Sequence, residues 1–271
     1  MDATAWTTSP GAAHIAEVRA IHRVAAGAVG VLIGVVAVLW LSGHRGRRGV
    51  TAVVLMLLFV TAFLALLGRY TPGAASPAVT LGNLLGGMAL LALLWLLREQ
   101  LTVRALPPVS RLVVVTAHAT LLLVAAQVVV GGLVSAKYAA LACVTLPDCN
   151  GLWWPQYWSW AVFDPLHQIQ ASGSDLAPAM RRTLHIVHRY GAVLTACAVA
   201  GLAAALCRSD ARWRALGVIV AGILLLQIAL GAALILAPPL LMLTVAHDTA
   251  AALLLAAAVT LTYRTNAAKA R

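Results

Sequence analysis

The chain has 271 residues, of which 62% are hydrophobic and only 10% are charged, and its mean hydropathy is +0.93. A soluble domain carries about a quarter charged residues, so lipid is the expected solvent for most of this chain. Its formal charge of +11 would suggest a nucleic-acid partner in a soluble protein. Here the basic residues lie in short loops between apolar stretches, where membrane topology explains them, so we predict no nucleic-acid binding.

The apolar stretches have the length of spanning helices and lack the alternation of barrel strands. The sequence therefore predicts an all-α polytopic membrane protein with about seven transmembrane helices. Glycine and proline mark several joints, including Thr71-Pro72-Gly73 and Pro238-Pro239. In chain order the predicted spans are Val24–Leu41, Val50–Leu67, Val79–Leu97, Leu112–Ser135, Val187–Cys207, Leu216–Ala237 and Leu240–Tyr263.

Lysine and arginine set the expected orientation of these spans. The connections around Arg47, Arg111 and Arg212 and the C-terminal tail are basic, whereas Tyr70–Ala78 is nearly uncharged. The positive-inside rule places these basic connections and the C-terminus in the cytoplasm, and we expect the protein in the cell (inner) membrane. The long connection 136–184 then lies outside. An odd number of spans leaves the N-terminus outside as well, so we expect either that the polar N-terminal tail crosses the membrane unaided or that an upstream helix is absent from this chain.

An internal repeat relates spans that lie four apart. Ile21-His22-Arg23 opens the first span and Val187-His188-Arg189 opens the fifth. Asn83 in the third span and His247 in the seventh occupy matching positions near the outer end. Spans four apart run in the same direction, so this is a parallel repeat of four-helix-bundle type with its first helix missing.

Three histidines at one membrane depth are the most informative feature of the sequence, because polar residues inside a bilayer are costly. Paired imidazoles from facing helices can hold heme iron in a membrane bundle, whereas the alternative is three unrelated interfacial histidines. The arginines that follow two of them either pair with heme propionates or extend to the interface. The residues concerned are His22, His188 and His247, with Asn83 in the fourth position and Arg23 and Arg189 as the arginines.

Other polar residues have plainer interpretations. His185, one turn before His188, is either a residue that supports His188 or an exposed loop residue, and His118 is interpreted as a hydrogen-bonded interior histidine. Asp248 is either a proton carrier or a residue facing a polar cavity. Cys143 and Cys149 in the outer connection are predicted to form a disulfide, because an oxidising compartment permits one there, and the alternatives are a redox pair or two unpaired thiols. The nearby tryptophans predict a lid or re-entrant segment on the outer surface.

These motifs together resemble heme A synthase, the membrane enzyme that converts heme O to heme A for cytochrome oxidase assembly. The resemblance covers nearly the whole chain and is carried by the His-Arg repeats, by His247 and by the stretches Gly82–Gly87, Gln127–Cys143 and Pro147–Gly151. It implies two four-helix halves, here 1–105 on the substrate side and 106–271 around a bound heme b. It also implies that a porphyrin methyl group is oxidised to a formyl group.

By position, the resemblance implies that His188 and His247 bind the resident heme. It implies that His22 faces the substrate heme O and that His22 and Asn83 form the catalytic side. The chain departs from the family at three points. The first helix, with its loop cysteine pair, is absent, Arg19 replaces a glutamate, and Asn83 replaces a histidine. All three departures fall in the substrate half.

Two functions therefore compete. One is heme A synthase, working with membrane lipid, heme O synthase and oxidase assembly factors, and forming a homo-oligomer. The alternative is a non-catalytic heme b-binding membrane protein that serves oxidase assembly or electron transfer. A transporter is disfavoured because the repeat is parallel.

Overall fold

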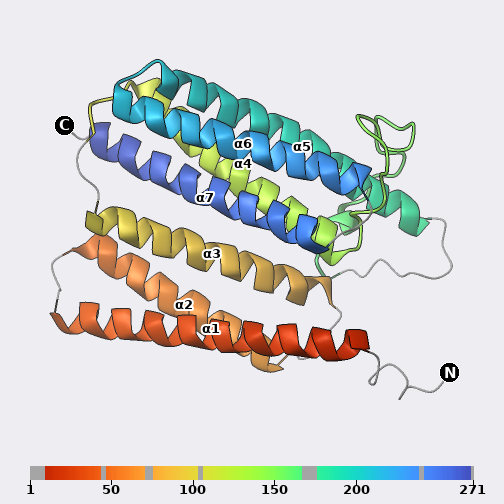
Figure 1. Ribbon diagram of the computed structural model, residues 1–271, viewed down its shortest axis with the longest axis horizontal. Helices are drawn as coiled ribbons and strands as arrows, with labels where there is room; N and C mark the ends of the chain where they lie inside the picture. The colour runs from red at the N-terminus through yellow and green to blue at the C-terminus, as the bar shows by residue number, and fades with distance from the viewer. Residues whose placement is uncertain are drawn as a thin grey trace. The chain divides into compact units, whose positions relative to one another are not determined.

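The computed structural model describes residues 10–43, 47–70, 76–102, 106–166, 176–237 and 241–269. Within these ranges every helix of more than three residues is long and apolar enough to cross a membrane, and the only β-type pairing is one isolated bridge. The elements, seen in Figure 1, are α1 (Pro10–Gly43), α2 (Arg48–Tyr70), α3 (Pro77–Thr102), α4 (Arg111–Ala136), the short 3-10 helix η1 (Trp160–Val162), α5 (Leu176–Cys207), α6 (Ala211–Leu236) and α7 (Leu241–Lys269).

Seven spanning helices confirm the predicted fold class, a multi-pass all-α membrane protein. The predicted glycine and proline joints at Pro72-Gly73 and Pro238-Pro239 lie outside the described residues. Two helices begin well before their predicted spans: α1 begins at Pro10 rather than Val24, and α5 begins at Leu176 rather than Val187. Thr183, Leu184 and Ile186 are buried at this end of α5, so packing against the preceding connection extends the helix beyond its apolar part.

Contacts divide the chain into two units, 1–62 and 63–271. In the first unit α1 and the first part of α2 are tied by the indole of Trp40, whose Nε1 donates to Oγ1 of Thr51 at 3.1 Å. The predicted boundary between half-bundles, at residue 105, stays a prediction.

In the second unit, α4, α5, α6 and α7 form a four-helix bundle (Figure 1). Each helix packs against the next, and α7 closes the ring against α4, so α5 and α7 stand at opposite corners. The helix α3 packs on the outside, against α4 and α7. Leucines and valines fill the core around the fully buried Trp213. We call the end where α4 finishes and α5 and α7 begin the loop end, and the opposite one the far end.

The far end is joined by polar contacts between helices. The fully buried carboxylate of Glu99 on α3 accepts two hydrogen bonds from the guanidinium of Arg264 on α7, at 2.7 and 3.1 Å. His118 on α4 bonds to the carbonyl of Val114 and to the side-chain amide of Asn266. The prediction that His118 is hydrogen-bonded is confirmed, but its side chain is exposed rather than interior, because it lies on the outer face of the bundle.

The loop end carries the segment Lys137–Leu166, which we call the disulfide segment. Cys143 and Cys149 are bonded, as predicted. Asn150 and Gly151 both have positive φ and connect the bridged residues Cys149 and Leu152. Asn-Gly is the preferred pair for a two-residue hairpin turn, because both positions require that backbone conformation. The disulfide closes the loop Cys143–Cys149, and this turn follows it directly, so we call residues 143–152 the disulfide hairpin.

Candidate functional site

His188 and His247 enter the bundle from its two opposite corners, α5 and α7. Both side chains are partly buried, and the imidazoles lie near enough to interact electrostatically. The polar environment of each comes from a neighbouring helix, α4 for His188 and α6 for His247. The structure therefore brings together two of the histidines that the sequence singled out.

His188 is held by α4. The amide Nε2 of Gln127 lies 2.9 Å from its Nδ1 and also donates to the backbone carbonyl of His188 at 2.8 Å. Gly131, one turn further along α4, leaves room for the ring, because a Cβ there would lie 3.0 Å from the Cε1 atom of His188. Nδ1 is the ring nitrogen that meets Gln127, so Nε2 is the nitrogen left for another partner.

His247 has the same kind of surroundings on α6. The amide Nε2 of Gln227 lies 3.2 Å from its Nε2, and a Cβ on Gly231 would lie 3.2 Å from its Cε1. Two buried atoms here, His247 Nδ1 and Gln227 Oε1, have no hydrogen-bond partner among the described residues. A buried polar atom without a partner is costly, so it marks a place where a further group can bind.

This arrangement fits a cofactor that takes two imidazole ligands. No group of three or more His, Cys, Asp or Glu residues occurs in the described ranges, which disfavours a structural zinc site there. Heme iron, by contrast, takes axial ligands from two facing side chains. The glycines beside both rings and the unpaired nitrogen of His247 are consistent with such a group.

Arg189 follows His188 and faces the disulfide segment. Its guanidinium donates to the carbonyls of Thr145, at 2.9 Å, of Cys143, at 3.2 Å, and of Asp148. Its Nε atom is buried and has no partner among the described residues. Arg189 therefore ties the hairpin to α5, with one donor remaining.

His185 is a correction to the sequence analysis, since it is not an exposed loop residue. It lies on α5 with a buried side chain, and its Nδ1 donates to the carbonyl of Ala139 at 3.0 Å. Thr183 on the same helix donates to the carbonyl of Tyr157 at 2.6 Å. These two hydrogen bonds hold the disulfide segment against α5, so the role of His185 is to anchor that segment.

The other residues that the sequence singled out are not members of this pair. His22 and Arg23 are on α1 in the first unit, and Asn83 is an exposed residue on α3. Asp248 is half-buried on α7 beside His247. The tryptophans of the disulfide segment are exposed, and Trp158 contacts both Trp160 and Phe163.

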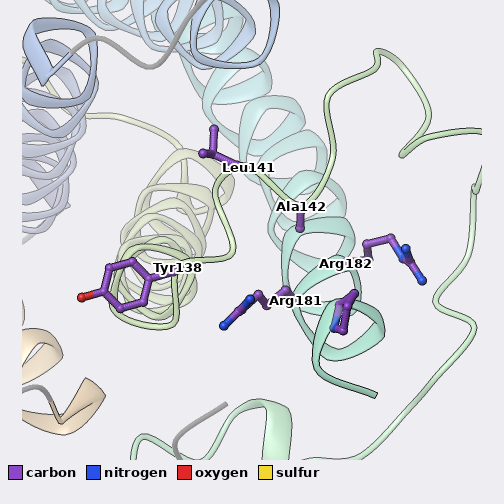
Figure 2. A pocket seen from close by; sticks show the side chains of 6 residues that line it. Tyr138, Leu141, Ala142, Arg181 and Arg182 are labelled. Atoms are coloured by element: carbon purple, nitrogen blue, oxygen red, sulfur yellow. The ribbon is translucent and has the colours of Figure 1, made fainter. Parts of the chain in front are cut away.

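An open pocket of about 200 Å³ lies elsewhere at the loop end, where the disulfide segment meets the start of α5 (Figure 2). Tyr138, Arg181 and Arg182 provide its polar lining, and the two arginines leave α5 on different sides. Lys137 lies next to Tyr138 in the chain and is buried, and its Nζ donates to the carbonyls of Ala161 and Val162. Burial lowers the pKa of Lys137, an effect that the nearby Asp164 carboxylate opposes.

Sequence reasoning missed the two glutamines. The available signal was the recurrence of Gln-x-x-x-Gly, at Gln127–Gly131 and Gln227–Gly231, in two predicted spans. Only packing shows that each glutamine meets a histidine, because they lie on different helices.

Two comparisons with known proteins bear on this site. Residues 9–259 match the family described as cytochrome oxidase assembly protein. The chain is also 33% identical over 253 residues to the heme A synthase of Shewanella oneidensis, an alignment that covers 90% of this chain and 74% of that protein. The matched region contains both histidines, both glutamines and the disulfide hairpin. The chain therefore belongs to the heme A synthase family of cytochrome oxidase assembly proteins.

Proposed function

We propose that this protein is a heme A synthase, an oxidoreductase that oxidises a methyl group of heme O to a formyl group for cytochrome oxidase assembly. Family membership and the similarity to a protein named heme A synthase support this activity. The observation that carries the proposal is the pair His188 and His247, placed at opposite corners of the bundle and each beside a glycine.

In this proposal His188 and His247 hold a resident heme b, which supplies a one-electron carrier within the membrane. Gln127 and Gln227 orient the two rings, and Gly131 and Gly231 keep the space beside them open. The remaining Nε donor of Arg189 is available to a propionate near the membrane surface. Arg23, which follows a histidine in the same way, is proposed to serve the substrate heme.

The substrate side is proposed from the sequence. His22 faces heme O, and Asn83 occupies the place where the family has a second histidine. A side-chain amide is a poor iron ligand, so heme O is expected to bind weakly there and to leave after oxidation. Heme O synthase and oxidase assembly factors are the proposed partners, and a homo-oligomer is proposed as the assembled form.

To test this, the chain is expressed in cells that make heme O but no heme A. Heme is then extracted, and absorption spectra of the purified protein are recorded. We expect heme A together with a low-spin b-type spectrum. His188→Ala or His247→Ala should remove that spectrum, whereas His22→Ala should keep most of it and abolish heme A. Loss of the bound heme in His22→Ala but not in His188→Ala would show that the two halves are assigned the wrong way round.

A non-catalytic heme protein is the second candidate, and Asn83 and Arg19 are the residues that favour it. Both replace family residues on the substrate side and leave His188 and His247 unaffected. The same experiment separates the two functions. Bound heme b without heme A formation would support the second candidate and reject the first.

We also propose that the protein lies in the inner membrane with the disulfide segment outside and the C-terminus in the cytoplasm. The disulfide supports this orientation, because such bonds persist in oxidising compartments. In intact cells a membrane-impermeant thiol reagent should label Trp160→Cys and leave Arg47→Cys unlabelled. Labelling at position 47 alone would reverse the orientation.

A further inference from the structure

The pocket at the loop end lies beside the ends of two membrane-spanning helices (Figure 2). Tyr138 comes shortly after the span that ends at Ala136 on α4. Arg181 and Arg182 come shortly after the start of another span, at Pro178 on α5. Helices leave the apolar layer of a membrane at such positions, so we expect the pocket at the level of the lipid headgroups.

The lining of this pocket is positively charged. Arg181 and Arg182 contribute to it, and none of its lining residues in the described part of the chain is acidic. The two carboxylates of the disulfide segment, Asp148 and Asp164, act on other cations. A guanidinium group binds phosphate oxygens through charge-assisted hydrogen bonds. The chemistry of the lining therefore selects an anion that offers several oxygen acceptors.

The rest of the lining is apolar or amphipathic. Leu141 and Pro178 are both exposed and carry no polar side-chain atom. A soluble phosphate ion gains nothing from these contacts, whereas the glycerol and the first methylene groups of a phospholipid do. The exposed Tyr138 is of a residue type enriched at the headgroup level, because its ring is apolar and its hydroxyl is polar. The combination fits a phospholipid better than a soluble anion.

The wall that carries Tyr138 is held in place from both sides. Before it, the buried Lys137 donates to two backbone carbonyls of η1. After it, the carbonyl of Ala139 accepts from His185 on α5 at 3.0 Å. Tyr138 itself has a φ of 55°, a conformation that is costly for a residue with a side chain. The pocket is thus formed in advance, which reduces the cost of ordering on binding.

We propose that this pocket binds the headgroup of an anionic phospholipid, in the leaflet on the side of the disulfide segment. Arg181 is directed to the side of Tyr138 and Arg182 to the opposite side of α5, so the headgroup lies across the start of the helix (Figure 2). The arginines bind the phosphate, and Leu141 lies against the glycerol. The bound lipid then joins α5 to the disulfide segment. This binding goes beyond the proposed heme chemistry and does not depend on it.

Photolabelling of the full chain in vesicles tests the proposal. The vesicles consist of phosphatidylcholine with a trace of photoreactive phosphatidylglycerol, whose reactive group is next to the glycerol. Labelled peptides are identified by mass spectrometry. We expect labelling within 138–142 or 178–182, and competition by added phosphatidylglycerol but not by inorganic phosphate. Photoreactive phosphatidylcholine should label these peptides much less.

The variants remove or keep the charge of the pocket. Arg181→Gln combined with Arg182→Gln should reduce the labelling about fivefold for each arginine removed, the effect of one basic residue near an anionic membrane surface. Replacing both arginines with lysine should retain most of the labelling. The matched control combines Arg111→Gln with Arg212→Gln, which removes two exposed charges at the far end and should leave labelling of the pocket unchanged.

Three results would overturn the proposal. The first is equal labelling of the pocket in the double glutamine variant and in the unsubstituted chain. The second is equal labelling by the two photoreactive lipids, which indicates ordinary lipid contact. The third is competition by inorganic phosphate, which indicates a site for a soluble anion. If the double variant does not fold, Arg182→Gln alone replaces it, and unchanged labelling there overturns the proposal equally.

Discussion

The two ends of the second unit differ in how their charged and histidine side chains are paired. At the far end the buried carboxylate of Glu99 on α3 is paired with Arg264 on α7, and the exposed His118 bonds to Asn266. At the loop end the described part of the chain leaves His247 Nδ1, Gln227 Oε1 and the Nε atom of Arg189 without hydrogen bonds. The same helices form both ends, so the difference comes from which side chains they carry there.

This contrast separates stability from function. Polar groups that satisfy each other within the bundle add cohesion, because a broken contact would leave a buried charge or donor unpaired. Polar groups left unpaired reduce stability, and proteins keep such features mainly at functional sites. Far-end substitutions should therefore change stability, and loop-end substitutions should change cofactor binding.

Of the substitutions considered, Glu99→Ala should reduce the stability of the protein most. It leaves the guanidinium of Arg264 without its carboxylate between α3 and α7, and breaking a buried pair costs about 3–5 kcal/mol. Thermal unfolding of the detergent-solubilised protein would measure the loss. The molecules that remain folded should keep their full content of heme.

The matched control is Arg98→Ala. Arg98 also contacts Glu99, at 2.8 Å, but its side chain is 54% exposed, so its removal should change stability little. If Glu99→Ala and Arg98→Ala had equally small effects on thermal stability, the Glu99–Arg264 pair would not stabilise the contact between α3 and α7.

Gly131→Ala should have a smaller effect on stability and a clear effect on the site. The added methyl would lie 3.0 Å from Cε1 of His188, and such overpacking costs about 1–3 kcal/mol. The ring must move, so the heme bound per folded protein should fall. Gly201→Ala on α5 adds the same methyl where no atom lies within 4 Å, and it should leave heme content unchanged. Equal heme content in both variants would contradict the idea that Gly131 makes room for the ring.

Much of the fold could be predicted because it follows from local properties of the chain. Apolar stretches that are long enough to cross lipid must be helical, since each backbone N–H and C=O needs a partner within its own segment. The start of α5 was predicted too late because the prediction followed the apolar stretch, which begins after the helix does. Residues 176–186 include several polar side chains, and their helix is stabilised by packing of Thr183 and His185 against the disulfide segment.

The sequence by itself determined the seven spans and the Cys143–Cys149 pair, because hydropathy and short spacing express them directly. Only the tertiary structure decided which side chains meet. It places α5 and α7 at opposite corners of the bundle. It also brings Gln127 into contact with His188 and Gln227 into contact with His247, and the guanidinium of Arg189 hydrogen-bonds to the disulfide hairpin. These contacts join residues on different helices, and in lipid the packing of small residues such as Gly131 and Gly231 sets how closely helices approach.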